Sequence, residues 1–271
     1  MPELPEVERA ARRIRRAVVG QTIARLSLIH PALKRRIPAR ALASLRGRKV
    51  VAVEQRAKHQ LLVLDDGRAL HVHFRMAGDW DVDKAGDELS RSARAAIEFV
   101  GGTRLLLVDP RALSAVTLLA KGATPFATLG PDPSSPDFDA ALAAALGRRA
   151  TPVKPALLDQ KVAAGVGNIY AAEALWEARI DPRAPSKSLV PAKVKELAEA
   201  IRVVLDRGRA GGRRYRQGVT ALRVYDREDQ PCPRCTTPIA RIVQAGRSTW
   251  LCPHCQAPVK PRPRRSAAAK R

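Results

Sequence analysis

The chain has 271 residues, of which 45% are hydrophobic, so it can bury a core in one or two domains. The chain has 49 Lys and Arg against 26 Asp and Glu, and the formal net charge of +23 indicates a polyanionic partner. Nucleic acid is the expected partner, and an acidic membrane surface is the alternative. No apolar run approaches the roughly 20 residues of a membrane span, and no signal peptide is recognisable. We therefore expect a cytoplasmic protein that is associated with the nucleoid through DNA.

The first eight residues, MPELPEVE, place a proline behind the initiator methionine and two carboxylates just beyond it. Removal of Met1 makes Pro2 a free secondary amine, and an N-terminal pKa of about 7.7 to 8.0 leaves a neutral fraction that can attack an electrophilic carbon. Attack on a sugar C1′ gives an iminium ion, which drives elimination. Glu3 and Glu6 would lie on one face of a helix that begins near Leu4, close to the amine. The structural alternative is an acidic first turn that complements the helix N-terminus.

The first 120 residues have the pattern of one β-rich domain with a helix at its start. Apolar residues recur at helical spacing over residues 5–19. From residue 22 to residue 119 the chain consists of short runs rich in Val, Leu and Ile, with turn signals at Asp66-Gly67 and Gly101-Gly102. This pattern predicts a mostly antiparallel β-sandwich with the N-terminal helix attached.

The following residues change in composition. Residues 121–137 are dense in Pro, Gly, Ser and Asp and are predicted to be a hinge linker. Helices are expected at 138–146, 154–159, 168–176 and 191–207, which makes residues 138–228 a second, helical domain. The Gly165-Val166-Gly167 turn precedes Asn168, whose side chain, with nearby backbone N–H groups, is predicted to bind a phosphate oxygen.

All four cysteines lie in two C-x2-C pairs separated by sixteen residues. Four thiolates suit one tetrahedral Zn²⁺ with no open position, so the metal is predicted to be structural and residues 229–257 to form a zinc β-ribbon. Two disulfides are the alternative. Residues 258–271 contain basic but no acidic residues and are expected to be a disordered tail. The predicted ligands are Cys232, Cys235, Cys252 and Cys255.

Six motifs together resemble the formamidopyrimidine-DNA glycosylase and endonuclease VIII family of base-excision repair enzymes, and the resemblance covers nearly the whole chain. They are MPELPEVE, RAKHQLL, HFRMAG, VDPRALS, KPALLDQ…GVGNIYAAE, and CPRC with CPHC. The resemblance implies that Pro2 is the nucleophile, Glu3 the acid/base and Glu6 the second acidic group. It also implies that Lys58 contacts the phosphates of the damaged nucleotide.

The same resemblance implies a DNA interface. Met76, Arg111 and Leu113 match the loops that fill the space left by an extruded base. Lys154 and Asn168, in the segment that resembles the family's helix–two-turns–helix, and Arg247 on the ribbon are carried over as phosphate contacts. The expected fold is therefore α+β with two domains, an N-terminal β-sandwich and a C-terminal helix–two-turns–helix bundle plus zinc ribbon.

The chain departs from the family pattern at three places. Ala57 replaces a glycine, and Leu113 replaces a residue that is commonly phenylalanine. The arginine-rich segment 207–223 is shorter than the corresponding loop of the family. We expect a monomeric DNA glycosylase and lyase that removes oxidised or ring-opened bases from duplex DNA by β- then δ-elimination, with weak excision of 8-oxoguanine. One alternative is an endonuclease VIII-like preference for oxidised pyrimidines or abasic sites. Another is a damaged-DNA-binding protein without catalysis.

Overall fold

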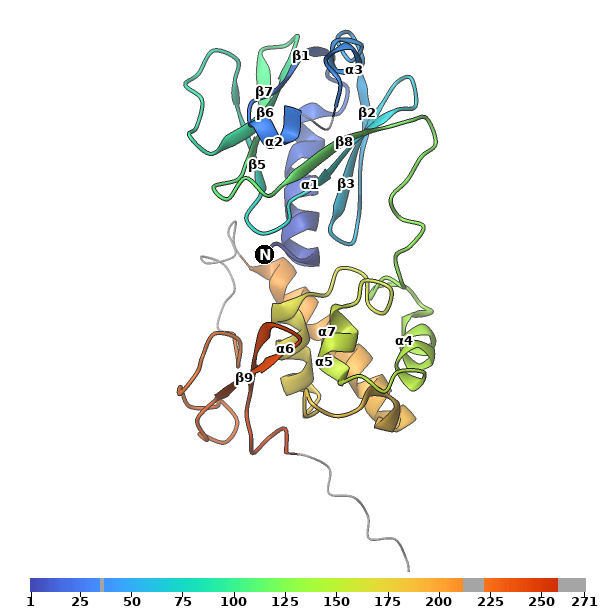
Figure 1. The fold of residues 1–271 in the computed structure, drawn as a ribbon, viewed down its shortest axis with the longest axis vertical. Coiled ribbons are helices and arrows are strands. Elements are labelled where there is room, and N and C mark those ends of the chain that lie inside the picture. The colour runs from blue at the N-terminus through green and yellow to red at the C-terminus, as the bar shows by residue number, and fades with distance from the viewer. Residues whose placement is uncertain (35–36, 212–221, 258–271) are drawn as a thin grey trace, which may run out of the picture.

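The computed structural model describes residues 1–34, 37–211 and 222–257. It has a β-rich lobe and a helical lobe, with the N-terminus at the junction between them (Figure 1). The predicted basic tail and most of the short arginine-rich segment lie outside the described residues. Among the described residues, no helix has both the length and the apolar character needed to cross a membrane.

The N-terminal lobe is a sandwich of two four-stranded antiparallel sheets, as predicted. One sheet has the order β1-β6-β7-β5, with strands Ile23–Leu28, Ala93–Phe99, Thr103–Val108 and Asp79–Lys84. The other has the order β2-β3-β4-β8, with strands Val50–Arg56, His59–Leu64, Ala69–His73 and Ala115–Leu119. The glycine turns fall where the sequence predicts them: Gly67 and Gly102 both have positive φ and connect β3 to β4 and β6 to β7. Two short helices, α2 (Pro31–Lys34) and α3 (Ala39–Ala43), follow β1.

Helix α1 (Leu4–Val18) packs against both sheets and reaches the second lobe. Its apolar stripe, including Val7, Ile14 and Val18, is fully buried in the sandwich core. Glu3 and Glu6 form a reciprocal capping box at its N-terminus, and Leu4 packs into the core of the other lobe. The helix therefore holds both acidic residues at the domain junction.

The second lobe is a helical bundle joined to the sandwich by a segment without helix or strand at residues 121–137. Its helices are α4 (Phe138–Gly147), α5 (Val153–Leu158), α6 (Asn168–Glu177) and α7 (Pro191–Ala210), with a 3-10 turn at Ser186–Ser188. Helix α6 is buried along most of its length and packs against α5, α7 and the ribbon.

The C-terminal ribbon consists of β9 (Ala240–Gln244) and β10 (Arg247–Leu251) in an antiparallel hairpin. Ala245 and Gly246 form its turn and both have positive φ, as the tightest hairpin turns require. The ribbon packs on α6 through Trp176 and Trp250. The predicted α+β fold, with sandwich, helical bundle and ribbon, is confirmed.

Candidate active site

Glu3 is buried at the domain junction, with 1% of its surface exposed. Its carboxylate accepts hydrogen bonds from the backbone N–H groups of Ile169 (2.9 Å) and Tyr170 (3.3 Å), at the N-terminus of α6. Gly167 makes this approach possible, because a Cβ atom there would lie 2.4 Å from Cδ of Glu3. A helix N-terminus with free N–H groups suits a negative charge, so α6 fixes Glu3 in one position.

Glu6 lies one turn further along α1 and is held from two sides. Its Oε2 accepts the backbone N–H of Glu3 at 2.9 Å, and its Oε1 accepts the hydroxyl of Tyr170 at 2.7 Å. Two carboxylates from the first turn of α1 are thus fixed by groups of the opposite lobe. This is the juxtaposition that the sequence predicts for Glu3 and Glu6.

Lys58 enters the same region from the turn between β2 and β3. It is buried, and its Nζ donates a hydrogen bond to the carbonyl of Val166 at 2.9 Å. The preceding residue, Ala57, is buried with φ of +52°. The turn therefore requires the left-handed conformation, in which an alanine costs about 1 kcal/mol or more relative to glycine. The replacement of the family's glycine is consequently not neutral.

The electrostatics of these groups are interdependent. Burial raises the pKa of Glu3, while the charge of Lys58 and the hydrogen bonds from Ile169 and Tyr170 act in the opposite direction. Burial lowers the pKa of Lys58, and the Glu3 carboxylate opposes that shift. A carboxyl group with a raised pKa beside an amine with a lowered one is a typical arrangement for proton transfer.

The N-terminus lies among these side chains. The chain carries Met1, so the free amine belongs to Met1 and the Pro2 nitrogen is in a peptide bond. Burial lowers the pKa of this amine, Glu3 and Glu6 raise it, and Lys58 and Arg111 lower it. The same surroundings would favour the neutral, nucleophilic form of an amine at Pro2.

The start of α6, where the sequence predicts a phosphate site, makes hydrogen bonds within the chain, and the DNA contact of Asn168 stays a prediction. The N–H groups of Ile169 and Tyr170 are bound by Glu3. The side chain of Asn168 accepts a hydrogen bond from Lys154 at 2.6 Å and donates one to the carbonyl of Ser248 at 3.1 Å. The helix N-terminus therefore binds a carboxylate of the chain itself, and Asn168 joins α6 to the ribbon.

Lys154 is buried, with 1% of its surface exposed, and its predicted phosphate contact stays a prediction. Its Nζ donates to Asn168 Oδ1 and to Thr249 Oγ1, at 2.6 and 2.7 Å, and also to a carbonyl of the ribbon. Burial, with the nearby charge of Arg247, lowers the pKa of Lys154 to about 8. Lys154 orients Asn168 and anchors the ribbon.

Three predicted interface residues lie exposed on adjacent loops of the sandwich. Met76 and Leu113 are 41% and 47% exposed, and Arg111, two residues before Leu113, is also exposed. The Asp109 carboxylate accepts N–H groups of Arg111, Leu113 and Ser114, which fixes the second loop. Ser114 Oγ also donates to the carbonyl of Phe74 at 3.1 Å, which ties the two loops together. Exposed apolar side chains on braced loops suit insertion into a base stack.

Arg247 is exposed at the first position of β10, directly after the hairpin turn. Its charge lowers the pKa of both Lys58 and Lys154, which places it close to the amines of the site. The ribbon thus brings a positive charge near the domain junction, and the phosphate contact of Arg247 stays a prediction.

The four cysteines form one cluster, with all Sγ atoms within 4.8 Å of one another. Individual Sγ separations of 3.4, 3.5 and 3.9 Å are close to the roughly 3.8 Å expected across a tetrahedral zinc–thiolate site and far from a disulfide bond. Trp176 Nε1 and the Cys255 N–H donate to sulfur atoms, as is typical around bound thiolates. The cluster fits one structural zinc ion, and the disulfide alternative is wrong.

The sequence did not single out two groups that shape this site. Tyr170 contacts both carboxylates, and the carbonyl of Val166 holds Lys58. Both belong to the GVGNIYAAE motif, but their contacts with residues 3, 6 and 58 are long-range and have no sequence signal.

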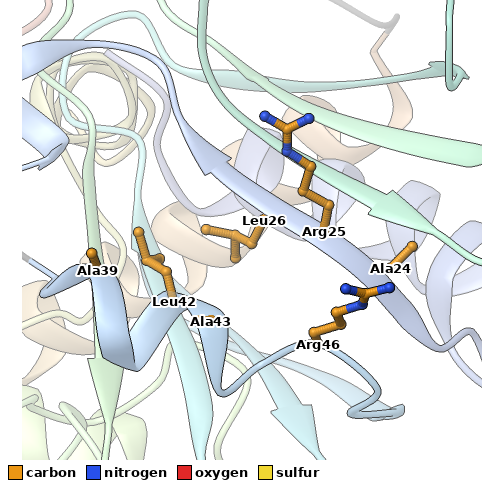
Figure 2. Close-up of a pocket in the computed structure, with 7 residues that line it drawn as sticks. All are labelled: Ala24, Arg25, Leu26, Ala39, Leu42, Ala43 and Arg46. Carbon is orange, nitrogen blue, oxygen red and sulfur yellow. The ribbon is translucent and has the colours of Figure 1, made fainter.

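A separate cavity of about 520 Å³ lies between β1 and α3, away from the domain junction (Figure 2). It contains two arginines and no carboxyl group, so it offers no acid–base pair. Its lining residues are Ala24, Arg25, Leu26, Ala39, Leu42, Ala43 and Arg46.

A buried glutamate and a buried lysine lie beside the N-terminus at the junction of the two lobes, and the ribbon carries a four-cysteine cluster that fits one zinc ion. The chain matches the models of three domains: the formamidopyrimidine-DNA glycosylase N-terminal domain (residues 1–116), the formamidopyrimidine-DNA glycosylase H2TH domain (129–217), and the zinc finger found in FPG and IleRS (229–258). The chain belongs to the formamidopyrimidine-DNA glycosylase family.

Similar proteins are named formamidopyrimidine-DNA glycosylase, and the similarity extends over nearly their whole length. The formamidopyrimidine-DNA glycosylase of Chloroflexus aurantiacus is 41% identical, over 94% of this chain and 98% of the relative. The formamidopyrimidine-DNA glycosylase of a Nocardioides species is 40% identical, over 99% of this chain and 97% of the relative.

Solved structures agree with these relatives. The MutM (Fpg) protein of Thermus thermophilus, at 37% identity, superposes with a TM-score of 0.83 over 94% of this chain and 98% of that one. The Lactococcus lactis formamidopyrimidine-DNA glycosylase, solved with DNA that contains an AP site, superposes with a TM-score of 0.88 at 28% identity. The superposition covers 94% of this chain and 100% of that one.

Proposed function

We propose that this chain excises damaged bases from duplex DNA and then cleaves the strand, with the amine of Pro2 as nucleophile once Met1 is removed. The observation that carries the proposal is the placement of the N-terminus beside Glu3, Glu6 and Lys58 at the domain junction. Damaged double-stranded DNA is the partner, consistent with the net charge of +23 and with similar proteins in complex with FAPY-dG and abasic-site DNA.

In the proposed reaction the target nucleotide is turned out of the duplex. The neutral Pro2 nitrogen attacks C1′, and the bond from C1′ to the base breaks. Glu3, whose pKa is raised by burial, donates a proton as the sugar ring opens to the iminium ion. The iminium then drives β-elimination of the 3′ phosphate and δ-elimination of the 5′ phosphate.

The remaining residues would bind and deform the DNA. The positive charges of Lys58 and Arg247 would bind the nucleotide's phosphates. Such contacts position the strand without reading its sequence. Met76, Arg111 and Leu113 would enter the duplex where the nucleotide has left it. The zinc ion supplies no chemistry, because four thiolates complete its coordination; it holds the ribbon, and with it Arg247, in place.

The test is borohydride trapping on a duplex that contains one abasic site. The processed protein should form a covalent protein–DNA adduct, and Glu3→Gln should form it at least about a hundredfold more slowly, since general acid–base groups contribute roughly 10²–10⁴. Absence of any adduct, with intact DNA binding, would instead support a damaged-DNA-binding protein without catalysis.

For lesion preference we propose that 8-oxoguanine is a weak substrate and that oxidised pyrimidines, ring-opened purines and abasic sites are better ones. Leu113 is an exposed aliphatic wedge and gives less stacking than an aromatic ring would. A similar MutM has been solved in complex with DNA that contains carbocyclic 8-oxo-G. Single-turnover rates on a panel of matched duplexes distinguish these preferences.

A further inference from the structure

We propose that Tyr170 is a positioning residue for the reaction and that its hydroxyl fixes Glu6 in the orientation that the chemistry needs. The inference rests on the proposed function, because it assumes that Glu6 takes part in proton transfer. It concerns a side chain of the helical lobe acting on a carboxylate of the sandwich lobe.

Tyr170 contacts both site carboxylates. Its hydroxyl donates a hydrogen bond of 2.7 Å to Oε1 of Glu6, and its backbone N–H donates one of 3.3 Å to Oε2 of Glu3. The residue is buried, with a relative exposure of 2%. Glu3 and Glu6 are further linked because the Glu3 N–H donates to the other Glu6 oxygen. One residue of α6 therefore sets the relative position of the two carboxyl groups.

The phenol is itself held in place by α7. Gly208 lies against the ring so closely that a Cβ atom there would be 2.2 Å from the hydroxyl oxygen and 2.7 Å from Cε1 and Cζ. Gly208 stands inside the 20-residue helix α7, where glycine is otherwise unfavourable. The close approach explains its presence. The hydroxyl cannot move toward α7, and its hydrogen bond keeps it directed at Glu6.

The hydroxyl stays protonated. Burial raises the pKa of Tyr170 far above its usual range, and the nearby Glu6 carboxylate raises it further. A phenol that stays protonated at all working pH values donates to a carboxylate but cannot replace it as a base. Tyr170 thus acts through Glu6, and the coupling crosses the domain junction where the DNA would bind.

The test compares Tyr170→Phe with a matched control, Tyr225→Phe, whose ring packs on Trp250 in the ribbon cluster. Three quantities are measured with abasic-site duplex: the maximal single-turnover rate of adduct formation under borohydride, the dissociation constant, and the melting temperature. We expect Tyr170→Phe to lower the rate about tenfold, with the dissociation constant unchanged within about twofold. Tyr225→Phe should keep the wild-type rate.

A second variant keeps the hydroxyl but displaces it. Gly208→Ala introduces a methyl group at the phenol and should reproduce the rate loss, whereas Gly147→Ala, where an added Cβ meets no atom within 4 Å, should not. A wild-type rate in Tyr170→Phe, or in folded Gly208→Ala, overturns the inference and leaves the proposed function standing. A parallel loss of rate, affinity and melting temperature in both variants shows a merely structural role and also overturns it. Failure of the wild-type protein to form any adduct refutes the proposed function itself.

Discussion

The contact between Gly167 and Glu3 allows one sharp prediction. Gly167 has an extended backbone, with φ of −136° and ψ of −158°, which any residue can adopt. Gly167→Ala therefore introduces no backbone strain. Its methyl group would lie 2.4 Å from Cδ and 2.6 Å from Oε1 of Glu3, so either the carboxylate or the α6 backbone must move.

Both responses are costly. Overpacking a buried contact costs about 1–3 kcal/mol. Moving the carboxylate away leaves the buried N–H groups of Ile169 and Tyr170 without acceptors, at about 1–3 kcal/mol for each group. We expect the free energy of unfolding to fall by about 2–3 kcal/mol. The rate of adduct formation should fall by about a hundredfold or more, because a displaced acid cannot protonate the sugar.

The assay is borohydride trapping under single turnover, with thermal unfolding measured on the same preparations. Gly147→Ala is the control, because its added Cβ meets no atom within 4 Å at the end of α4. Glu3→Gln gives the rate expected when the acid is lost. A Gly167→Ala protein that traps DNA as fast as wild type would show that the position of Glu3 at the α6 N-terminus does not matter for the reaction.

Three further predictions follow from the metal site, the histidines and the wedge. Metal analysis should find one zinc ion per chain, and Cys232→Ser should unfold the ribbon and weaken DNA binding while the sandwich stays folded; oxidised thiols without zinc would contradict this. Burial and neighbouring positive charges lower the pKa of His59 to about 4 and of His73 to about 3. Below about pH 6.5 these histidines therefore bind more protons in the unfolded chain than in the folded one. Stability should therefore fall as pH falls from 7.5, by about 1–2 kcal/mol per histidine at pH 5, with no further loss from these groups below about pH 3; denaturant titrations giving equal stability at both pH values would refute it. Excision of 8-oxoguanine should be slower than abasic-site cleavage, and Leu113→Phe should reduce the difference between the two single-turnover rates. Equal rates on the two substrates in the wild-type chain would show that Leu113 does not limit excision.

Local patterns predicted the elements of this fold well. The apolar stripe of α1 and the glycine turns of the sandwich depend on residues near in sequence, and the structure places them within one or two residues of expectation. The four cysteines were equally predictable, because their spacing alone suits one tetrahedral ion. The position of Glu3 near the amine followed from its adjacency in the chain.

Tertiary contacts decided what the sequence did not predict. Asn168 and the N-terminal N–H groups of α6 have the pattern of a phosphate site, but Glu3, 166 residues earlier, binds those N–H groups. Lys154 has the pattern of an exposed cation, but the ribbon folds over it and supplies its acceptors. Neither the docking of the two lobes nor that of the ribbon leaves a local signal in the chain.

Peptide mapping of the trapped adduct can identify which nitrogen of the protein attacks the sugar, and we expect it to be the N-terminal amine of Pro2. Two preparations are compared, one with Met1 removed and one that retains it. The reduced sugar should be attached to the nitrogen of Pro2 in the first preparation, and the second should form no adduct. An adduct on Lys58, on another lysine, or on the Met1-bearing chain would contradict it.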